Sequence, residues 1–180
     1  MSDRPLCRLY VEDALAPGGH VALTPGQAHY LRDVLRAPAG AVVALFNGRD
    51  GEFLARLTPG RGKGSAALVE GQLRPQASGP DLWLLFAPVK RAPIDSLVAK
   101  ATELGAARLC PVLTRHTQVA RVNMERLRAN VIEAAEQCER LDVPEVAEPA
   151  PLGAVLDSWT GGRLLLVCDA RSGAPPVAEV

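Results

Sequence analysis

The stretch that decides the fold lies at residues 82–113 and reads LWLLFAPVKRAPIDSLVAKATELGAARLCPVL. It opens with a continuous apolar run at residues 82–87, which is typical of a strand buried on both faces. A helix is expected over residues 94–104, and it would bury Ile94, Leu97, Val98, Ala101 and Leu104. Gly105 fits the C-terminal cap of this helix, and an apolar strand follows at residues 109–113. The order strand, helix, strand predicts a parallel sheet with right-handed crossovers.

The same alternation continues toward the C-terminus. Asn123 is a suitable N-cap for a helix that runs to about residue 140. The expected buried face of this helix contains Leu127, Val131, Ala134, Ala135 and Cys138. A further apolar strand, LLLVCD, is expected at residues 164–169. We therefore predict that residues 81–180 form an α/β domain.

The first 75 residues predict a small β-barrel that carries one short helix. Strands are expected at residues 6–11, 42–47, 52–58 and 65–71, separated by turns rich in glycine and proline. Thr24, Pro25 and Gln27 form a capping box with proline at the first helical position. The expected buried face of this helix contains Ala28, Leu31, Val34 and Leu35. Residues 76–80 form a linker between the barrel, residues 1–75, and the α/β domain.

Composition excludes several classes of protein. The chain has 180 residues, of which 48% are hydrophobic, and a formal net charge of zero, so it is not a disordered chain. It lacks a signal peptide and an apolar run long enough to span a membrane. Four cysteines without a C-x-x-C motif and three histidines without ligand spacing argue against a metal site or a disulfide framework. We therefore expect a cytoplasmic protein that holds no metal.

Charge is distributed unevenly along the chain. Residues 1–75 and 90–140 are both basic, whereas residues 141–180 are acidic, and almost all of the basic residues are arginines. Arginine suits phosphate recognition and base stacking. A genome rich in G and C also favours arginine over lysine, so this bias carries no function by itself.

Several basic residues follow the ends of expected strands. Lys90 and Arg91 come after the first apolar strand, and Arg115 and His116 come after the second. Because ligands bind at the carboxyl ends of strands in open parallel sheets, these cations are candidates for binding an anionic substrate. The alternative is an ordinary solvated loop.

Two further groups of polar residues are candidates. Glu133, Gln137 and Arg140 are spaced at i, i+4 and i+7 and form one stripe on the second long helix. In the barrel, Arg8, Arg32 and Arg36 are candidates for a basic face that contacts the phosphate backbone of a nucleic acid. The alternative for both groups is a solvated surface.

Seven motifs in order resemble a known family: HYLRDVLR (29–36), GEF (51–53), APVK (87–90), KATELGA (100–106), PVLTRHTQVA (111–120), EAAEQ (133–137) and RLDVPEV (140–146). They resemble the small-subunit ribosomal RNA uridine-N3 methyltransferases, often called RsmE. The resemblance implies a PUA-like RNA-binding barrel, followed by a SPOUT-type methyltransferase domain with a C-terminal knot. It also implies a homodimer that uses S-adenosylmethionine to methylate N3 of one uridine in 16S ribosomal RNA, free or in the 30S particle.

The resemblance also implies roles for particular residues. It places Glu133, Gln137 and Arg140 near the active site. For the reaction that it implies, Arg115, or Lys90 and Arg91, are suitable cations to stabilise the uridine anion. The expected RNA contacts are made by Arg8, Arg32, Arg36, Lys90 and Arg91. Glu133 is a candidate for the general base.

The chain departs from the family after residue 169. Family members continue into a G-P-E-G-G segment and a further helix that form the knot, so we expect an incomplete knot here and expect most S-adenosylmethionine contacts to lie beyond Val180. A truncated gene model, a fragment and a natural non-catalytic form are all possible explanations. The alternative function is an RNA-binding module without catalysis, and a more remote one is an α/β enzyme that acts on a small molecule.

Overall fold

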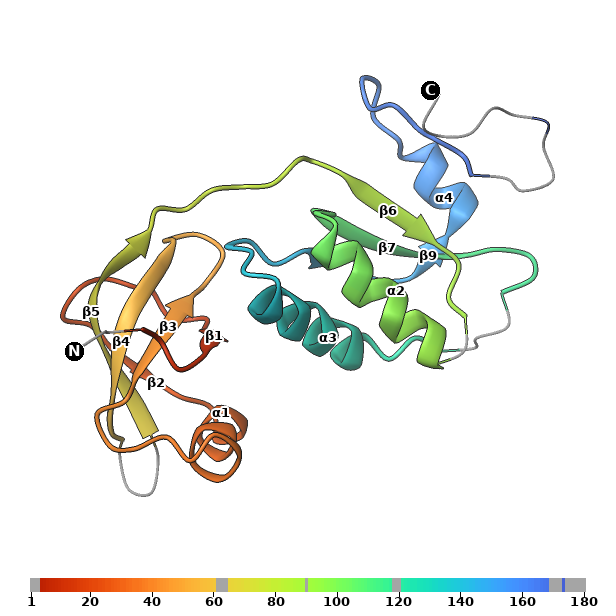
Figure 1. Ribbon diagram of the computed structural model, residues 1–180. Helices are drawn as coiled ribbons and strands as arrows, with labels where there is room; N and C mark the ends of the chain where they lie inside the picture. The colour runs from red at the N-terminus through yellow and green to blue at the C-terminus, as the bar shows by residue number, and fades with distance from the viewer. Residues whose placement is uncertain (1–3, 61–64, 90, 118–120, 169–172, 174–180) are drawn as a thin grey trace.

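The computed structural model describes residues 4–60, 65–89, 91–117, 121–168 and 173, with the side chains of residues 91 and 92 excepted. Its strands form two separate sheets, one in each half of the chain (Figure 1). The expected fold class, a barrel followed by a parallel α/β domain, is confirmed.

The first sheet is curled and contains five strands in the order β1-β3-β4-β5-β2. Their bounds are β1 (Arg8–Tyr10), β2 (His20–Ala22), β3 (Val42–Phe46), β4 (Glu52–Pro59) and β5 (Ser65–Arg74). β1 pairs with β3 in parallel and the remaining pairs are antiparallel. All four expected strands are present. β2 was not predicted, because three residues are too few to show an alternating pattern.

The helix of the barrel starts as expected and then changes its winding. α1 (Pro25–His29) begins with the predicted capping box at Thr24, and a π-helix, η1 (Tyr30–Val34), follows directly. The N–H of Leu35 donates to the carbonyl oxygen of Tyr30, five residues earlier. This wider turn shifts the helical periodicity. Val34 was therefore wrongly expected on the buried face, since it is 61% exposed.

The second sheet is parallel, with the order β6-β7-β8 and with β9 paired to β7. Its strands are β6 (Trp83–Phe86), β7 (Arg108–Leu113), β8 (Glu145–Val146) and β9 (Ala150–Pro151). The helices are α2 (Arg91–Glu103), α3 (Met124–Gln137) and α4 (Leu152–Asp157). α2 and α3 pack against each other and cover one face of the sheet (Figure 1).

Helix boundaries in this domain follow the predictions closely. Asn123 caps α3 by accepting a hydrogen bond from the N–H of Arg126. Gly105 has the left-handed φ of 98° that a C-terminal cap requires. Leu104 was wrongly expected to be buried, because the last turn of α2 ends before it and leaves it exposed.

Two apolar runs are less buried than their sequences predicted. β6 lies at the edge of the sheet among the described strands, so Phe86 is its one buried residue. The strand expected at residues 164–169 is absent from the part of the run that the structure describes, residues 164–168, where Leu164 and Val167 are exposed. An apolar run predicts burial, but it does not specify the neighbouring strand that must supply the hydrogen bonds. Asp169 lies outside the described residues.

Candidate functional site

The residues predicted to be catalytic fall into two groups at opposite ends of α3. Arg115 lies in the turn after β7, and the end of β7 shares a cleft with the start of α3. Glu133 and Gln137 lie in the last turns of α3, beside the barrel. α3 has 14 residues, and a rise of ~1.5 Å per residue makes it ~20 Å long. One nucleoside therefore cannot contact both groups within one chain.

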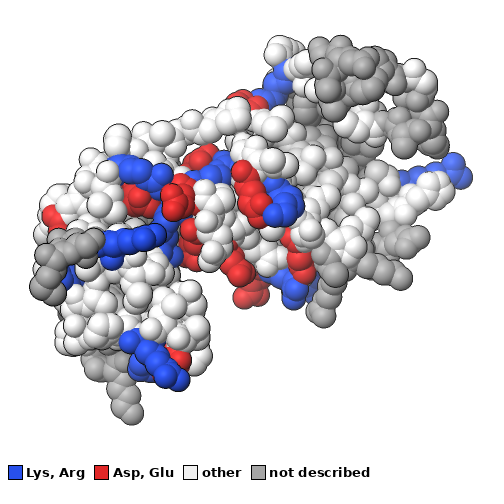
Figure 2. Space-filling model, viewed as in Figure 1, with Lys and Arg blue, Asp and Glu red and all other residues white. Residues whose placement is uncertain are grey.

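A cleft of about 760 Å³ lies between the barrel and the C-terminal end of α3. Figure 2 shows that charged side chains of both signs gather where the two lobes meet. The charged residues that line the cleft are Arg4, Arg8, Glu52, Arg74, Glu133, Glu136 and Glu139. We call it the interlobe cleft.

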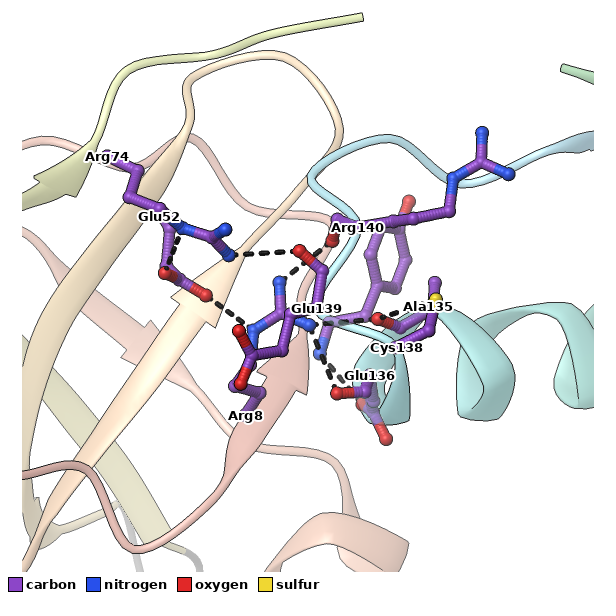
Figure 3. Close-up of polar contacts among 9 residues, drawn as sticks. Arg8, Glu52, Arg74, Ala135, Glu136, Cys138, Glu139 and Arg140 are labelled. Atoms are coloured by element: carbon purple, nitrogen blue, oxygen red, sulfur yellow. Dashed lines mark hydrogen bonds and ion pairs between the residues drawn. The ribbon is translucent and has the colours of Figure 1, made fainter. Parts of the chain in front are cut away.

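Arg8 of β1 crosses from the barrel and caps the end of α3 (Figure 3). Its Nη1 donates to the carbonyl oxygens of Ala135 and Glu136 at 2.8 and 3.0 Å, and its Nη2 donates to that of Arg140 at 2.8 Å. The last carbonyls of a helix have no partner within the helix, and a cation there also opposes the helix dipole. The Arg8 side chain is 12% exposed. The guanidinium of Arg8 is therefore engaged within the fold, and its predicted contact with RNA stays a prediction.

Arg74 and Glu52 complete this cap. Nη2 of Arg74 donates to the carbonyl oxygen of Glu139 at 3.0 Å, and its Nε donates to Glu52 at 2.7 Å. Glu52 also accepts a hydrogen bond from Arg8, so one carboxylate joins two guanidinium groups. Burial raises the pKa of Glu52, but the hydrogen bonds from Arg74 and Arg8 outweigh it and hold the pKa below its usual value. We call Arg8, Glu52 and Arg74 the guanidinium clamp.

Arg140 has a similar structural role in the second lobe. Its Nη1 donates to the carbonyl oxygens of Thr102 and Ala106, at 2.6 and 2.9 Å, and so caps the end of α2. Its Nη2 pairs with Asp142 at 2.8 Å. The side chain is 11% exposed. The donors of Arg140 are thus committed within the fold, and its predicted catalytic role stays a prediction.

Glu136 of α3 and Cys7 of the barrel both line the interlobe cleft. The N–H of Tyr10 donates to Oε1 of Glu136 at 2.8 Å, which adds a second link between the lobes. Burial raises the pKa of Glu136, and the nearby charge of Glu133 raises it further. Burial, followed by the charge of Glu136, raises the pKa of the Cys7 thiol to about 11. Cys7 is therefore a protonated, unreactive thiol at neutral pH.

Glu133 and Gln137 face the interlobe cleft from successive turns of α3. Both side chains are exposed. Within the described part of the chain, neither makes a side-chain hydrogen bond or an ion pair. They are thus available to a ligand, unlike Arg8 and Arg140.

The carboxyl end of the parallel sheet presents Arg115. This residue is exposed, and it lies in a turn closed by a 2.8 Å hydrogen bond from the N–H of Thr114 to the hydroxyl of Thr117. Lys90 lies outside the described residues. Arg91 begins α2 at the same edge, but its side chain is not among those described.

A second cleft, of about 800 Å³, opens at this edge of the sheet. Its lining includes Leu113, Arg121, Asn123, Glu125 and Glu148. All five side chains are exposed. Because the described lining offers no buried polar group to fix an adenine or a ribose, these residues do not make a complete site for S-adenosylmethionine.

The residues that hold S-adenosylmethionine were expected mostly beyond Val180. Val180 itself lies outside the described residues, as does the rest of the segment 174–180. That expectation therefore stays a prediction. The lining given for the second cleft includes only residues that the structure describes.

Arg32 and Arg36 are exposed beside the π-helix of the barrel. Arg32 pairs with Asp33 at 2.7 Å, and Asp33 also contacts His29. Arg36 has a left-handed φ of 52°. Both arginines therefore lie on the surface, whereas Arg8 does not.

The clamp residues Glu52 and Arg74 were missed by sequence reasoning. Glu52 begins a predicted strand and is 6% exposed, and a buried carboxylate requires a partner. That partner becomes evident only from the strand register, in which Glu52 lies opposite Arg74.

Two family models match the chain. Residues 77–179 match an RNA methyltransferase domain, and residues 23–70 match an RNA methyltransferase PUA domain. The first match covers more than half of the chain, and the second falls within the barrel.

Relatives with known names agree with these matches. The ribosomal RNA small subunit methyltransferase E of Rickettsia conorii is 38% identical over 139 residues, which cover 76% of this chain and 57% of the relative. The protein of the same name from a Synechocystis species is 33% identical over 158 residues, 86% of this chain and 52% of the relative. The chain thus spans about half the length of the curated relatives that it matches.

Solved structures show the same fold. A putative methyltransferase from Legionella pneumophila with bound SAM has a TM-score of 0.82 at 26% identity, over 94% of this chain and 72% of that one. The ribosomal RNA small subunit methyltransferase E from Neisseria gonorrhoeae, bound to S-adenosyl methionine, has a TM-score of 0.78 at 26% identity. The match covers 86% of this chain and 66% of that one. With a family model matched across residues 77–179, the chain belongs to the RNA methyltransferase family, with a PUA-like barrel ahead of its methyltransferase domain.

Proposed function

We propose that this chain belongs to an enzyme that transfers a methyl group from S-adenosylmethionine to N3 of a uridine in small-subunit ribosomal RNA. The observation that carries the proposal is the match of residues 77–179 to the RNA methyltransferase domain. Residues 1–75 would bind RNA, and residues 81–180 would contribute to the methyltransferase domain. We further propose a cytoplasmic homodimer that acts on the RNA or on the 30S particle.

The chemistry sets two requirements for the RNA side of the site. N3 lies on the Watson–Crick edge, so the uridine must be unpaired before it reacts. N3 also carries a proton, and its loss leaves an anion that a nearby cation stabilises. Arg115 suits this task because it is an exposed cation at the carboxyl end of the parallel sheet. Lys90 and Arg91 remain candidates for the same edge.

Glu133 does not suit the role of general base for that uridine within one chain, because the length of α3 separates it from Arg115. We assign Glu133 and Gln137 to the interlobe cleft instead. Arg32 and Arg36 remain proposed phosphate contacts on the barrel.

The test is methylation of small-subunit particles that lack the modification. The full-length protein that contains this chain is incubated with these particles and with S-adenosylmethionine carrying an isotopic label, and nucleosides from the RNA are analysed by mass spectrometry. We expect labelled N3-methyluridine, with Arg115→Ala lowering its formation more than it lowers RNA affinity. RNA binding without any methyl transfer would favour the alternative function, an RNA-binding module.

A further inference from the structure

The interlobe cleft leaves apolar surface open to solvent. Leu6, Tyr30 and Leu73 line it and are 46%, 38% and 44% exposed. They come from three separate segments of the barrel. Single exposed apolar residues are common, but several that converge on one hollow indicate a surface that a ligand covers.

Tyr30 is the aromatic member of this lining. It begins η1, the π-helix that follows α1. Short π-helical segments occur frequently at functional sites. An exposed aromatic ring on such a turn is a suitable surface for stacking a planar ligand, as the aromatic residues of RNA-binding proteins stack single bases.

The polar rim of the cleft consists mainly of hydrogen-bond acceptors. Glu133, Gln137 and Glu139 are exposed on its α3 side, and none of their side chains has a hydrogen bond or ion pair among the described residues. Arg8 and Arg74 also line the cleft, but their guanidinium groups are engaged with Glu52 and with helix carbonyls. The groups left for a ligand are thus two carboxylates and an amide, with Arg4 as the remaining cation.

These acceptors select among planar ligands. A carboxylate accepts hydrogen bonds and donates none. Guanine presents two adjacent donors, N1–H and the N2 amine, which match the two oxygens of one carboxylate. Uracil presents a single N–H between two carbonyl oxygens, and these would face the carboxylate unfavourably. The acidic rim also disfavours a phosphate within the cleft.

We propose that the interlobe cleft binds an unpaired guanine base of the RNA, which stacks on Tyr30 and donates its N1–H and N2–H groups to Glu133. This base is distinct from the methylated uridine, because α3 separates the cleft from the carboxyl end of the sheet. The proposal rests on the proposed function, in that the ligand is part of the same RNA.

Two short single-stranded RNAs test the base preference: a fluorescent oligouridine, and the same oligomer with one internal guanosine. Fluorescence anisotropy should show about tenfold tighter binding of the guanosine oligomer, as a bidentate base contact provides. Glu133→Gln should abolish this preference. Glu125→Gln is the matched control, because it removes the same charge from the first turn of the same helix and should keep the preference.

Stacking is tested separately. Tyr30→Phe should keep the preference for guanosine, and Tyr30→Leu should weaken the binding of that oligomer about tenfold. Equal affinity of the unmodified chain for the two oligomers would overturn the guanine assignment. Binding of an arginine-rich peptide in the cleft, with no binding of either oligomer, would overturn it as well. If the chain binds small-subunit RNA but shows no base preference, this proposal fails alone. If it binds no ribosomal RNA, the proposed function fails as well.

Discussion

The guanidinium group of Arg8 donates to two carbonyl groups in the last turn of α3 and to a third, that of Arg140, in the loop that follows. Lysine carries the same charge but cannot direct several donors from one planar fork. We therefore expect Arg8→Lys to lower the free energy of unfolding by about 2 kcal/mol. Arg8→Gln should lower it by about 3 kcal/mol, because it also removes the charge beside buried Glu52. Urea denaturation followed by tryptophan fluorescence measures both changes.

The salt dependence of RNA binding distinguishes this cap from a phosphate contact. RNA affinity falls as salt rises, and the salt slope is the slope of the logarithm of the binding constant against the logarithm of the salt concentration. Loss of a cation that contacts phosphate reduces this slope by about one, whereas Arg8→Gln should leave it unchanged. Arg36→Asn is the matched control, since Arg36 is exposed and asparagine tolerates its left-handed φ. It should reduce the slope without destabilising the fold. A reduced slope with normal stability in Arg8→Gln would contradict the cap.

The two thiols at either end of the chain should differ in reactivity. Cys7 has a pKa raised to about 11, chiefly by burial, and Cys168 is exposed. Because the thiolate is the reactive form, iodoacetamide near neutral pH should label Cys168 well before Cys7. Peptide mapping by mass spectrometry gives the order. Equal rates would show that the Cys7 thiol is not held protonated.

The same raised pKa is linked to stability at alkaline pH. The folded value for Cys7 is above the unfolded value of about 8.5. Its contribution to stability is therefore fully present below about pH 8.5, and it is lost as the pH rises toward the folded value.

At the residue level, the sequence identified polar positions but not their tasks. Arg140 and Glu133 belong to one stripe of a helix that was predicted to run to about residue 140. α3 ends at Gln137, so Arg140 lies beyond it and turns toward α2, whereas Glu133 faces the cleft beside the barrel. Arg8 contacts residues more than a hundred positions away. No local pattern carries such a pairing, because it depends on how the two sheets pack.

The guanidinium clamp joins three elements of the barrel to α3, and it depends on the ionised form of Glu52. Glu52 has a folded pKa below its unfolded value of about 4.3. Its contribution to stability is therefore fully present above about pH 4.3 and is lost as the pH falls through the folded pKa. Glu52→Gln should lower the free energy of unfolding at neutral pH. It should also make that free energy depend less on pH in the acidic range. Urea midpoints measured across the acidic range would test this.

Asp33 provides the comparison for this experiment. Its pKa is lowered to about 2, first through its hydrogen bond with Arg32, but the side chain is exposed to solvent. Solvent screens such a pair, so Asp33→Asn should change the acid profile much less than Glu52→Gln. A larger effect from Asp33→Asn than from Glu52→Gln would contradict the dominant role of Glu52 in the acid dependence of stability.

Element boundaries were predictable wherever a local signal existed. The capping box at Thr24, the N-cap at Asn123 and the glycine cap at Gly105 each depend on neighbouring residues, and all three are confirmed. The exposure of Val34 was not predictable, because a switch from α to π winding leaves no mark in the apolar spacing. β8 and β9, with two residues each, were missed for the same reason as β2.

At the scale of the molecule, the clamp determines whether the lobes behave as one unit. Domains that share a small polar interface usually move relative to each other. Here Arg8 and Arg74 together bind four carbonyls, two in the last turn of α3 and two in the loop that follows it, and the N–H of Tyr10 adds a bond to Glu136. Because these contacts are lost when either lobe unfolds, each lobe stabilises the other. We therefore expect the two lobes to unfold together.

Native chromophores can test this coupling, because Tyr10 and Tyr30 lie in the barrel and Trp83 and Trp159 lie in the α/β domain. Second-derivative absorbance of the tyrosines and fluorescence of the tryptophans should give one coincident urea transition. The double variant Arg8→Gln, Arg74→Gln should separate the two transitions, because it removes all four carbonyl contacts. Arg36→Asn should leave them coincident. If the double variant still unfolds in one transition, the coupling must reside in the remaining contacts, such as that between Tyr10 and Glu136.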